Sequence, residues 1–157
     1  VEKLFIILDK ANLKPVISNQ ILVWLITHYA VAAGLSAGIM SAGSASKFIE
    51  NTAIIKITMK AIREGLAICE RMGINPKTEK ANRLYLLPLF ISVPIAKKIY
   101  GNDALQLMFD GHINHSPVEI RQMIDDIIDS GVKYAVTTPN LAQLKSYISS
   151  NQTNKSK

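Results

Sequence analysis

The sequence contains a single cysteine, Cys69, and has neither a Gly-x-Gly-x-x-Gly motif nor a P-loop. Because one thiol cannot form an internal disulfide, a reducing compartment is favoured, and we expect a cytoplasmic protein. Without a glycine-rich phosphate loop, the chain has no nucleotide-binding fingerprint of its own. We therefore expect that this chain alone binds no cofactor tightly.

Charge is absent from one long stretch, since no Asp, Glu, Lys or Arg occurs between Ile21 and Ser46. On length alone this stretch qualifies as a membrane span, and Gly34 and Gly38 have the small-xxx-small spacing of packed membrane helices. However, His28 and several hydroxyl side chains interrupt it, and no cluster of Lys or Arg flanks it. We interpret it as a buried helix of a soluble domain, with no membrane partner.

The net charge of +6 arises from 18 basic and 12 acidic residues that are scattered along the chain. Lys56, Lys60 and Arg63 share one helical face, but no aromatic side chains interleave with them and no nucleic-acid motif accompanies them. This pattern is typical of a solvated surface. We expect no nucleic-acid partner.

At 157 residues with 48% hydrophobic content, the chain has the length and composition of one globular domain. No segment shows the alternation of a strand, so the predicted fold class is all-α, a multi-helix bundle. Residues 1–148 form the predicted domain, and the polar tail 149–157 is predicted to be disordered. The predicted helices cover residues 2–11, a long segment capped by Ser18, 52–72, 79–100 broken at Pro88 and Pro94, 103–110, 117–135 and 139–148.

The helix predicted over residues 52–72 has apolar residues on two adjoining stripes. A helix that is apolar over so wide an arc must be covered from two sides, so we expect it to be central to the domain. Cys69 lies on one stripe and is interpreted as a core thiol. The stripes consist of Ile54, Ile57, Ala61, Gly65, Ile68 and Met72, and of Ile55, Met59, Ile62, Leu66 and Cys69.

The most chemically suggestive segment runs from Asp110 to Ile124, where two carboxylates and two imidazoles precede and begin an amphipathic helix. Ser116 is a natural N-cap, Pro117 suits the first helical position, and Glu119 can reach back to the cap. Glu119 either serves only this cap or also contacts a ligand, since a helix N-terminus favours both.

Histidines suggest two further kinds of site. A metal site could be drawn from Asp110, His112, His115 and Glu119, but His-x-x-His in a loop has no fixed geometry, and we predict no metal. His28 lies in the apolar stretch, either as a hydrogen-bonded core histidine or as an acid–base group.

Several short motifs occur in a consistent order along the chain, namely Trp24, Glu64-Gly65 with Ala67, Met72-Gly73-Ile74, Asp110-Gly, Pro117-Val-Glu119-Ile, Gly131, Thr138-Pro139-Asn140 and Leu144. Together they resemble the C-terminal domain of the ketopantoate reductase (2-dehydropantoate 2-reductase) family. The resemblance extends from Glu2 to Ile148 and implies an all-helical domain similar to that of 6-phosphogluconate dehydrogenase. It also implies a role in pantothenate biosynthesis, with NADPH bound by an N-terminal Rossmann domain that lies outside this chain. The first residue, Val1, fits the trailing part of a longer protein.

Carried over residue by residue, the resemblance also shows a departure. The family's catalytic lysine lies two positions after Trp24 and an asparagine follows it by four, and here these positions are Ile26 and Ala30. Isoleucine cannot polarise a keto oxygen or deliver a proton, so the chemistry is altered. His28, beside the vacated position, is the expected replacement proton donor, and Thr27 lies next to it.

The remaining family residues have matches in the helical region that follows. Glu119 matches the family's active-site glutamate and Asp110 an aspartate, while Gln106 replaces a substrate-binding serine. We therefore expect Glu119 and His28 to be catalytic, and Asp110, Gln106 and Thr27 to bind substrate.

The resulting expectation is the substrate-binding and dimerisation domain of an NADP-dependent oxidoreductase that reduces a 2-keto acid or related carbonyl. The isolated chain is expected to be inactive. A homodimer is expected because small residues along the charge-free helix let a second backbone approach closely. The alternative is a non-enzymatic helical interaction module.

Overall fold

A computed structural model describes residues 1–153, and over these residues the chain is all-α, as predicted. No strand occurs in this range. Two short 3-10 turns, Pro76–Thr78 and Lys80–Asn82, precede α5. The helices are α1 (Glu2–Lys10), α2 (Ile21–Ala42), α3 (Ala45–Glu50), α4 (Thr52–Arg71), α5 (Arg83–Leu86), α6 (Leu89–Tyr100), α7 (Asp103–His115), α8 (Pro117–Lys133) and α9 (Pro139–Thr153).

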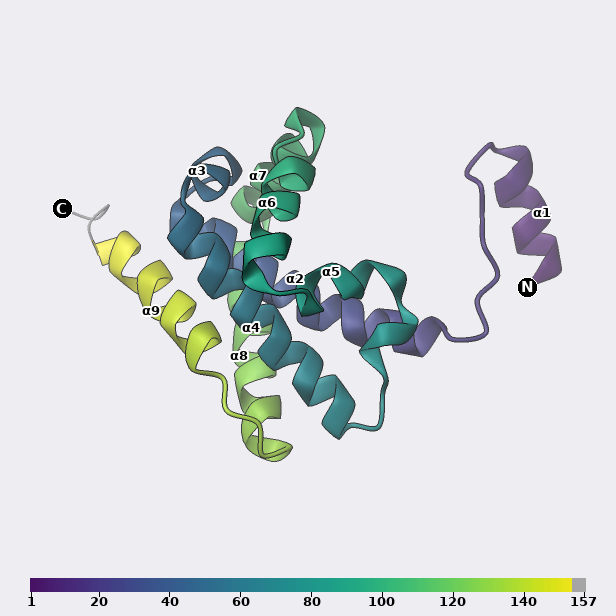
Figure 1. Ribbon diagram of the computed structural model, residues 1–157. Helices are drawn as coiled ribbons and strands as arrows, with labels where there is room; N and C mark the ends of the chain where they lie inside the picture. Colours follow the sequence, from purple (N-terminus) through teal and green to yellow (C-terminus); the bar gives the residue numbers. More distant parts are fainter. Residues whose placement is uncertain (154–157) are drawn as a thin grey trace.

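Helices α2 and α4 form the central pair, and their backbones approach closely at glycines (Figure 1). A Cβ atom added at Gly34 would lie 2.7 Å from Ile62 Cγ1, and one added at Gly38 would overlap the Thr58 hydroxyl. The small residues of α2 are therefore buried against α4 within one chain. They are not available to a second copy, which removes the basis on which a dimer was expected.

Helix α4 is central because it contributes to two separate hydrophobic clusters, as its two stripes predict. One stripe supplies Ala61 and Ile68 to a cluster formed with α8 and α9, and Cys69 joins this cluster. The other supplies Met59 and Ile62 to a cluster with Phe48, Tyr85, Val93, Ala96 and Tyr100. The exception is Met72, which is 39% exposed at the end of the helix.

Two helices continue past residues that were expected to end them. Pro94 lies inside α6, where it removes the hydrogen bond to the Phe90 carbonyl, but the neighbouring Val93 and Ala96 are buried and hold the helix in place. Helix α7 runs through Gly111 to His115 instead of ending near Asp110. The segment expected to be a loop is therefore helical.

The chain ends differ from the sequence expectation in one respect. Helix α9 continues to Thr153, so residues 149–153 of the predicted disordered tail are helical. The rest of that tail, 154–157, lies outside the described residues.

The N-terminal arm stands apart from the helical body (Figure 1). None of the residues of α1 is buried, and Leu4 and Ile7 are 60% and 63% exposed. The arm leads into α2, whose first turns also expose Leu22 and Leu25. Exposed apolar side chains therefore occur both on the arm and on the first turns of α2.

By length and composition, α2 is the one helix among residues 1–153 that is apolar enough to cross a membrane, and half of its most apolar window is buried inside the protein.

Candidate functional site

A cavity of about 540 Å³ lies where one face of α2 meets α5, the end of α6 and α7. We call it the Trp24 cavity. Most of its wall is apolar, and a few polar side chains converge on it, which is the usual composition of a small-molecule site. Its polar lining residues are Thr27, His28, Ser36, Glu79, Asn82, Tyr85, Tyr100 and His112.

The α2 side of the cavity follows from helical spacing. Trp24 and His28 are one turn apart, and their rings stack with centroids 4.6 Å apart and an interplanar angle of 9°. This stacking holds the exposed imidazole at the cavity. Thr27 is buried, and its hydroxyl donates to the Val23 carbonyl at 2.9 Å, so only its oxygen lone pairs remain for a ligand.

The opposite wall contains residues that sequence reasoning did not assign to a site. His112 lies one turn after Met108 and Phe109 on α7 and lines the cavity with them. It was considered only as a metal ligand, because its segment was expected to be a loop. Glu79 and Asn82 come from the turn before α5, and no local spacing connects them to His28.

Two buried tyrosines, Tyr85 and Tyr100, form part of the cavity wall. The hydroxyl oxygens of Tyr85 and Tyr100 are 2.5 Å apart and share a hydrogen bond. Burial raises the pKa of both phenols above the ordinary value, so both are protonated at neutral pH. Nothing in their spacing of fifteen residues signals this pair, since Pro88 interrupts the helix between them.

Asp110 and Gln106, the predicted substrate-binding residues of α7, have partners outside the Trp24 cavity. Asp110 Oδ1 accepts the Ala45 backbone N–H at 2.7 Å and so joins α7 to the start of α3. Gln106 Nε2 donates to the Gly101 carbonyl at 3.1 Å. Both side chains stabilise local structure, and the structure does not bring them together with Thr27 and His28.

Glu119 is exposed on the first turn of α8, and the expected capping box is not formed. The Ser116 side chain accepts no hydrogen bond from the helix, because the residue has φ −130° and ψ 48°, outside the usual N-cap geometry. Pro117 does occupy the first helical position. Glu119 is therefore free of the cap role and has no hydrogen-bond partner among the described residues.

A second hollow, of about 330 Å³, lies on the α8 side of α2, and Glu119 is outside its lining. Here Tyr29 donates to Asp126 Oδ2 at 2.6 Å. Burial raises the pKa of Tyr29 to about 12, and the charges of Asp126 and Glu119 contribute further. The hydrogen bonds from Tyr29 and Gln122 lower the pKa of Asp126.

This second hollow also contains Ile26 and Ala30, the positions of the family's lysine and asparagine. His28 lines the Trp24 cavity, so it does not occupy the place that the lysine would have. The five predicted site residues thus lie apart. Thr27 and His28 line the Trp24 cavity, while the others lie elsewhere: Asp110 at the α3–α7 contact, Gln106 beside Gly101 at the start of α7, and Glu119 on the first turn of α8.

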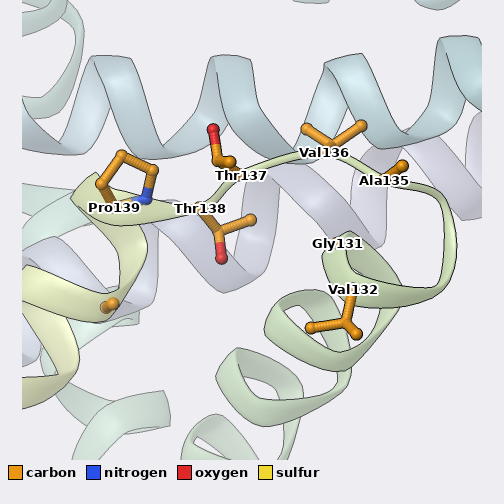
Figure 2. A pocket seen from close by; sticks show the side chains of 8 residues that line it. Gly131, Val132, Ala135, Val136, Thr137, Thr138 and Pro139 are labelled. Carbon is orange, nitrogen blue, oxygen red and sulfur yellow. The ribbon is translucent and has the colours of Figure 1, made fainter.

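The residues that carry the family resemblance at the α8–α9 turn are structural. Glu64 accepts the backbone N–H groups of Asn140 and Leu141 at the start of α9, at 3.0 Å each. At Gly131, an added Cβ would lie 2.8 Å from the Val136 carbonyl oxygen. The hollow beside this turn has no ionisable side chain in its lining, and Figure 2 shows it bordered by Val132, Thr137, Pro139 and their neighbours.

The described residues contain no Gly-x-Gly-x-x-Gly loop before a helix. Among them only Gly43 and Gly73 are glycines with positive φ. Gly43 lies between α2 and the six-residue helix α3, whose start is capped by the Ser44 hydroxyl, and Gly73 follows the end of α4. The start of α9 is occupied by the Glu64 carboxylate, which would repel a phosphate. Within the same residues, no group of three or more His, Cys, Asp and Glu side chains converges on one point.

No protein-family model, curated protein or solved structure was found to match this chain.

Proposed function

We propose that the chain is the helical substrate-binding domain of an NADP-dependent oxidoreductase of the ketopantoate reductase kind, with the Trp24 cavity as its substrate site. The observation that carries this proposal is the convergence of two imidazoles on an apolar cavity of about 540 Å³. Its substrate is a 2-keto acid or related carbonyl compound. The cofactor is held by a part of the protein outside the described residues.

The walls of the cavity determine how such a substrate would bind. Trp24, Met108 and Phe109 provide apolar contact area for a hydrocarbon side chain. His28 and His112 are exposed, so they lie at the open end, where a carboxylate can keep part of its hydration and accept hydrogen bonds from the rings. Thr27 can accept a hydrogen bond from a substrate hydroxyl.

Glu119 belongs to this proposal as a separate expectation. Glu119 lines neither cavity, but its charge acts on Tyr29, which lines the second hollow. A catalytic role for Glu119 therefore requires that the substrate reach the α8 side of α2. A catalytic role for His28 requires instead that the substrate bind on the α7 side of α2. One ligand titration therefore distinguishes the role of Glu119 from that of His28.

The test is an NMR titration of the full chain with 2-oxo-3-methylbutanoate, a simple branched 2-keto acid. We expect shifts of the Trp24 Nε1–H resonance and of the His28 and His112 ring protons. His115 is outside the lining and is the internal reference. His28→Ala should weaken binding severalfold, while His115→Ala should not. Shifts confined to Tyr29, Gln122 and Asp126 would assign the site to the second hollow, and no shift at all would overturn the proposal.

The exposed apolar surface of the N-terminal arm favours a second candidate function, a non-enzymatic dimerisation module. Leu4 and Ile7 on α1 and Leu22 and Leu25 on α2 are each between 47% and 69% exposed. Exposed apolar patches of this kind commonly mark protein–protein contacts. This candidate predicts self-association without any ligand in the Trp24 cavity.

A further inference from the structure

We infer that the buried end of the Trp24 cavity is a subsite for a neutral oxygen acceptor, the carbonyl or hydroxyl oxygen of a ligand, which receives a hydrogen bond from the Tyr85–Tyr100 pair. This inference rests on the proposed function only in that the cavity binds a small molecule. It adds a specificity determinant that neither the motifs nor the resemblance contains.

The two hydroxyl groups have one more hydrogen than their mutual hydrogen bond uses. Each phenol has one O–H, and the pair at 2.5 Å uses one of them, whichever residue donates. The second O–H has no acceptor among residues 1–153. Tyr85 and Tyr100 are only 6% and 8% exposed, so this donor also has little access to bulk water. An unsatisfied buried donor destabilises the protein, and a ligand oxygen in the cavity would remove that cost.

The pair is also held in position before any ligand arrives. Arg63 of α4 donates through Nε to the Tyr85 carbonyl at 2.6 Å and so anchors α5. The Tyr100 ring meets Phe109 edge to face, with centroids 5.8 Å apart. Both tyrosines are therefore held by contacts that involve no ligand, so a hydrogen bond from the spare O–H would need little further ordering.

The charge distribution indicates that the acceptor is neutral. His28 and His112 are exposed and Glu79 is half-buried, whereas no Lys or Arg lines the cavity. Arg63 is outside the lining, and its guanidinium is bonded to the Tyr85 and Leu87 carbonyls. A carboxylate at the buried end would lose its hydration without a compensating charge, which is costly. Protonated phenols can still donate to an uncharged oxygen. The preferred ligand is thus an apolar carbonyl or hydroxyl compound whose anionic group, if it has one, faces the imidazoles.

The test compares two probes of nearly the same shape, acetophenone and α-methylstyrene, in which C=CH₂ replaces C=O. Binding to the full chain is followed by the Trp24 Nε1–H resonance. We expect acetophenone to bind about threefold to tenfold more tightly, the range that one net hydrogen bond supplies. Tyr85→Phe or Tyr100→Phe alone should keep most of this preference, because each leaves one free O–H.

The double variant Tyr85→Phe/Tyr100→Phe should bind the two probes equally, with the affinity for α-methylstyrene unchanged. Tyr147→Phe, outside the cavity, is the matched control. Equal affinities in the unmodified protein would overturn the inference without any variant, as would a preference that survives in the double variant. If neither probe binds, the cavity itself is not a ligand site and the proposed function fails. If both bind equally, only the subsite fails.

Discussion

Glu64 of α4 holds Asn140 of α9 by two hydrogen bonds, one to the backbone N–H at 3.0 Å and one to the side-chain amide at 2.5 Å. The second carboxylate oxygen accepts the next N–H, that of Leu141. The Glu64 side chain of α4 therefore accepts the free N–H groups at the start of α9, as an N-cap side chain normally does. This contact fixes α9 against α4 and accounts for two of the motifs that carry the family resemblance.

The first prediction concerns this contact. Glu64→Gln should lower the free energy of unfolding by about 1.5–3 kcal/mol. The carboxylate would lose its charge-assisted hydrogen bonds, and the new NH₂ group could not accept the N–H groups that the carboxylate oxygen accepts. Urea denaturation measures the change. Glu70→Gln, at an exposed position of the same helix, is the matched control and should change stability by less than about 0.5 kcal/mol. Equal stabilities of the two variants would contradict this account of α9.

The second prediction tests the close packing of α2 on α4. Gly38→Ala should destabilise the protein by about 1–3 kcal/mol, since the added Cβ overlaps the Thr58 side chain. Gly111→Ala, inside α7 with no atom within 4 Å of the added Cβ, should instead stabilise it by about 0.5–1 kcal/mol. Thermal and urea unfolding measure the change in stability of each variant, which should be negative for Gly38→Ala and positive for Gly111→Ala. A stabilising Gly38→Ala would show that the two helices are farther apart.

The third prediction concerns Cys69, whose pKa burial raises to about 11. At pH 8 the folded protein should react with a thiol reagent far more slowly than the unfolded chain, because little thiolate is present and the sulfur is buried. A raised pKa favours the neutral thiol in the folded state, so its contribution to stability is complete below about pH 9 and is lost between about 9 and 11.

The unfolding free energy of the unmodified protein should therefore decline more steeply from pH 9 to 11 than that of Cys69→Ala. The tyrosines contribute equally to both proteins and cancel in the comparison. Parallel pH profiles, or rapid labelling of the folded protein at pH 8, would contradict the buried placement of this thiol.

The fourth prediction concerns self-association. If the chain forms a homodimer, the contact must use a surface other than the small residues of α2, and the N-terminal arm is the exposed apolar alternative. We expect a dimer at high micromolar concentration in sedimentation experiments, and a monomer for Leu4→Ser/Ile7→Ser. The control is Leu107→Ser, an exposed leucine on α7. A monomeric unmodified protein would refute the dimer, and a dimer that survives the arm substitutions would assign the contact elsewhere.

Much of the fold could be predicted from local patterns. The two apolar stripes of the 52–72 segment predicted the two clusters around α4. A helix that is buried on two faces needs apolar residues at helical spacing on both, and this pattern can be seen in the sequence. Gly73 with positive φ follows the end of α4, and Pro117 begins α8, both as expected. These features depend on a few neighbouring residues, so sequence reasoning reaches them.

Features that depend on tertiary contacts could not be predicted. Helix α7 passes through Gly111, which disfavours helix, because Ile113 packs against both clusters and Asp110 is bonded to Ala45 of α3. The site was also beyond local reasoning, since His28, His112, Tyr85 and Tyr100 come from four helices. Of the predicted site residues, only Thr27 and His28 line the Trp24 cavity, and both lie on one helix face with Trp24.

The most direct test of the central claim, that the Trp24 cavity is the substrate site, is a measurement of intermolecular NOEs between the protein and 2-oxo-3-methylbutanoate. The methyl protons of the ligand should show NOEs to the indole of Trp24, the only tryptophan, and to the side chains of Met108 and Phe109. NOEs to Leu25, Tyr29 and Ile127 instead, or none at a ligand concentration that saturates the shifts, would contradict the account.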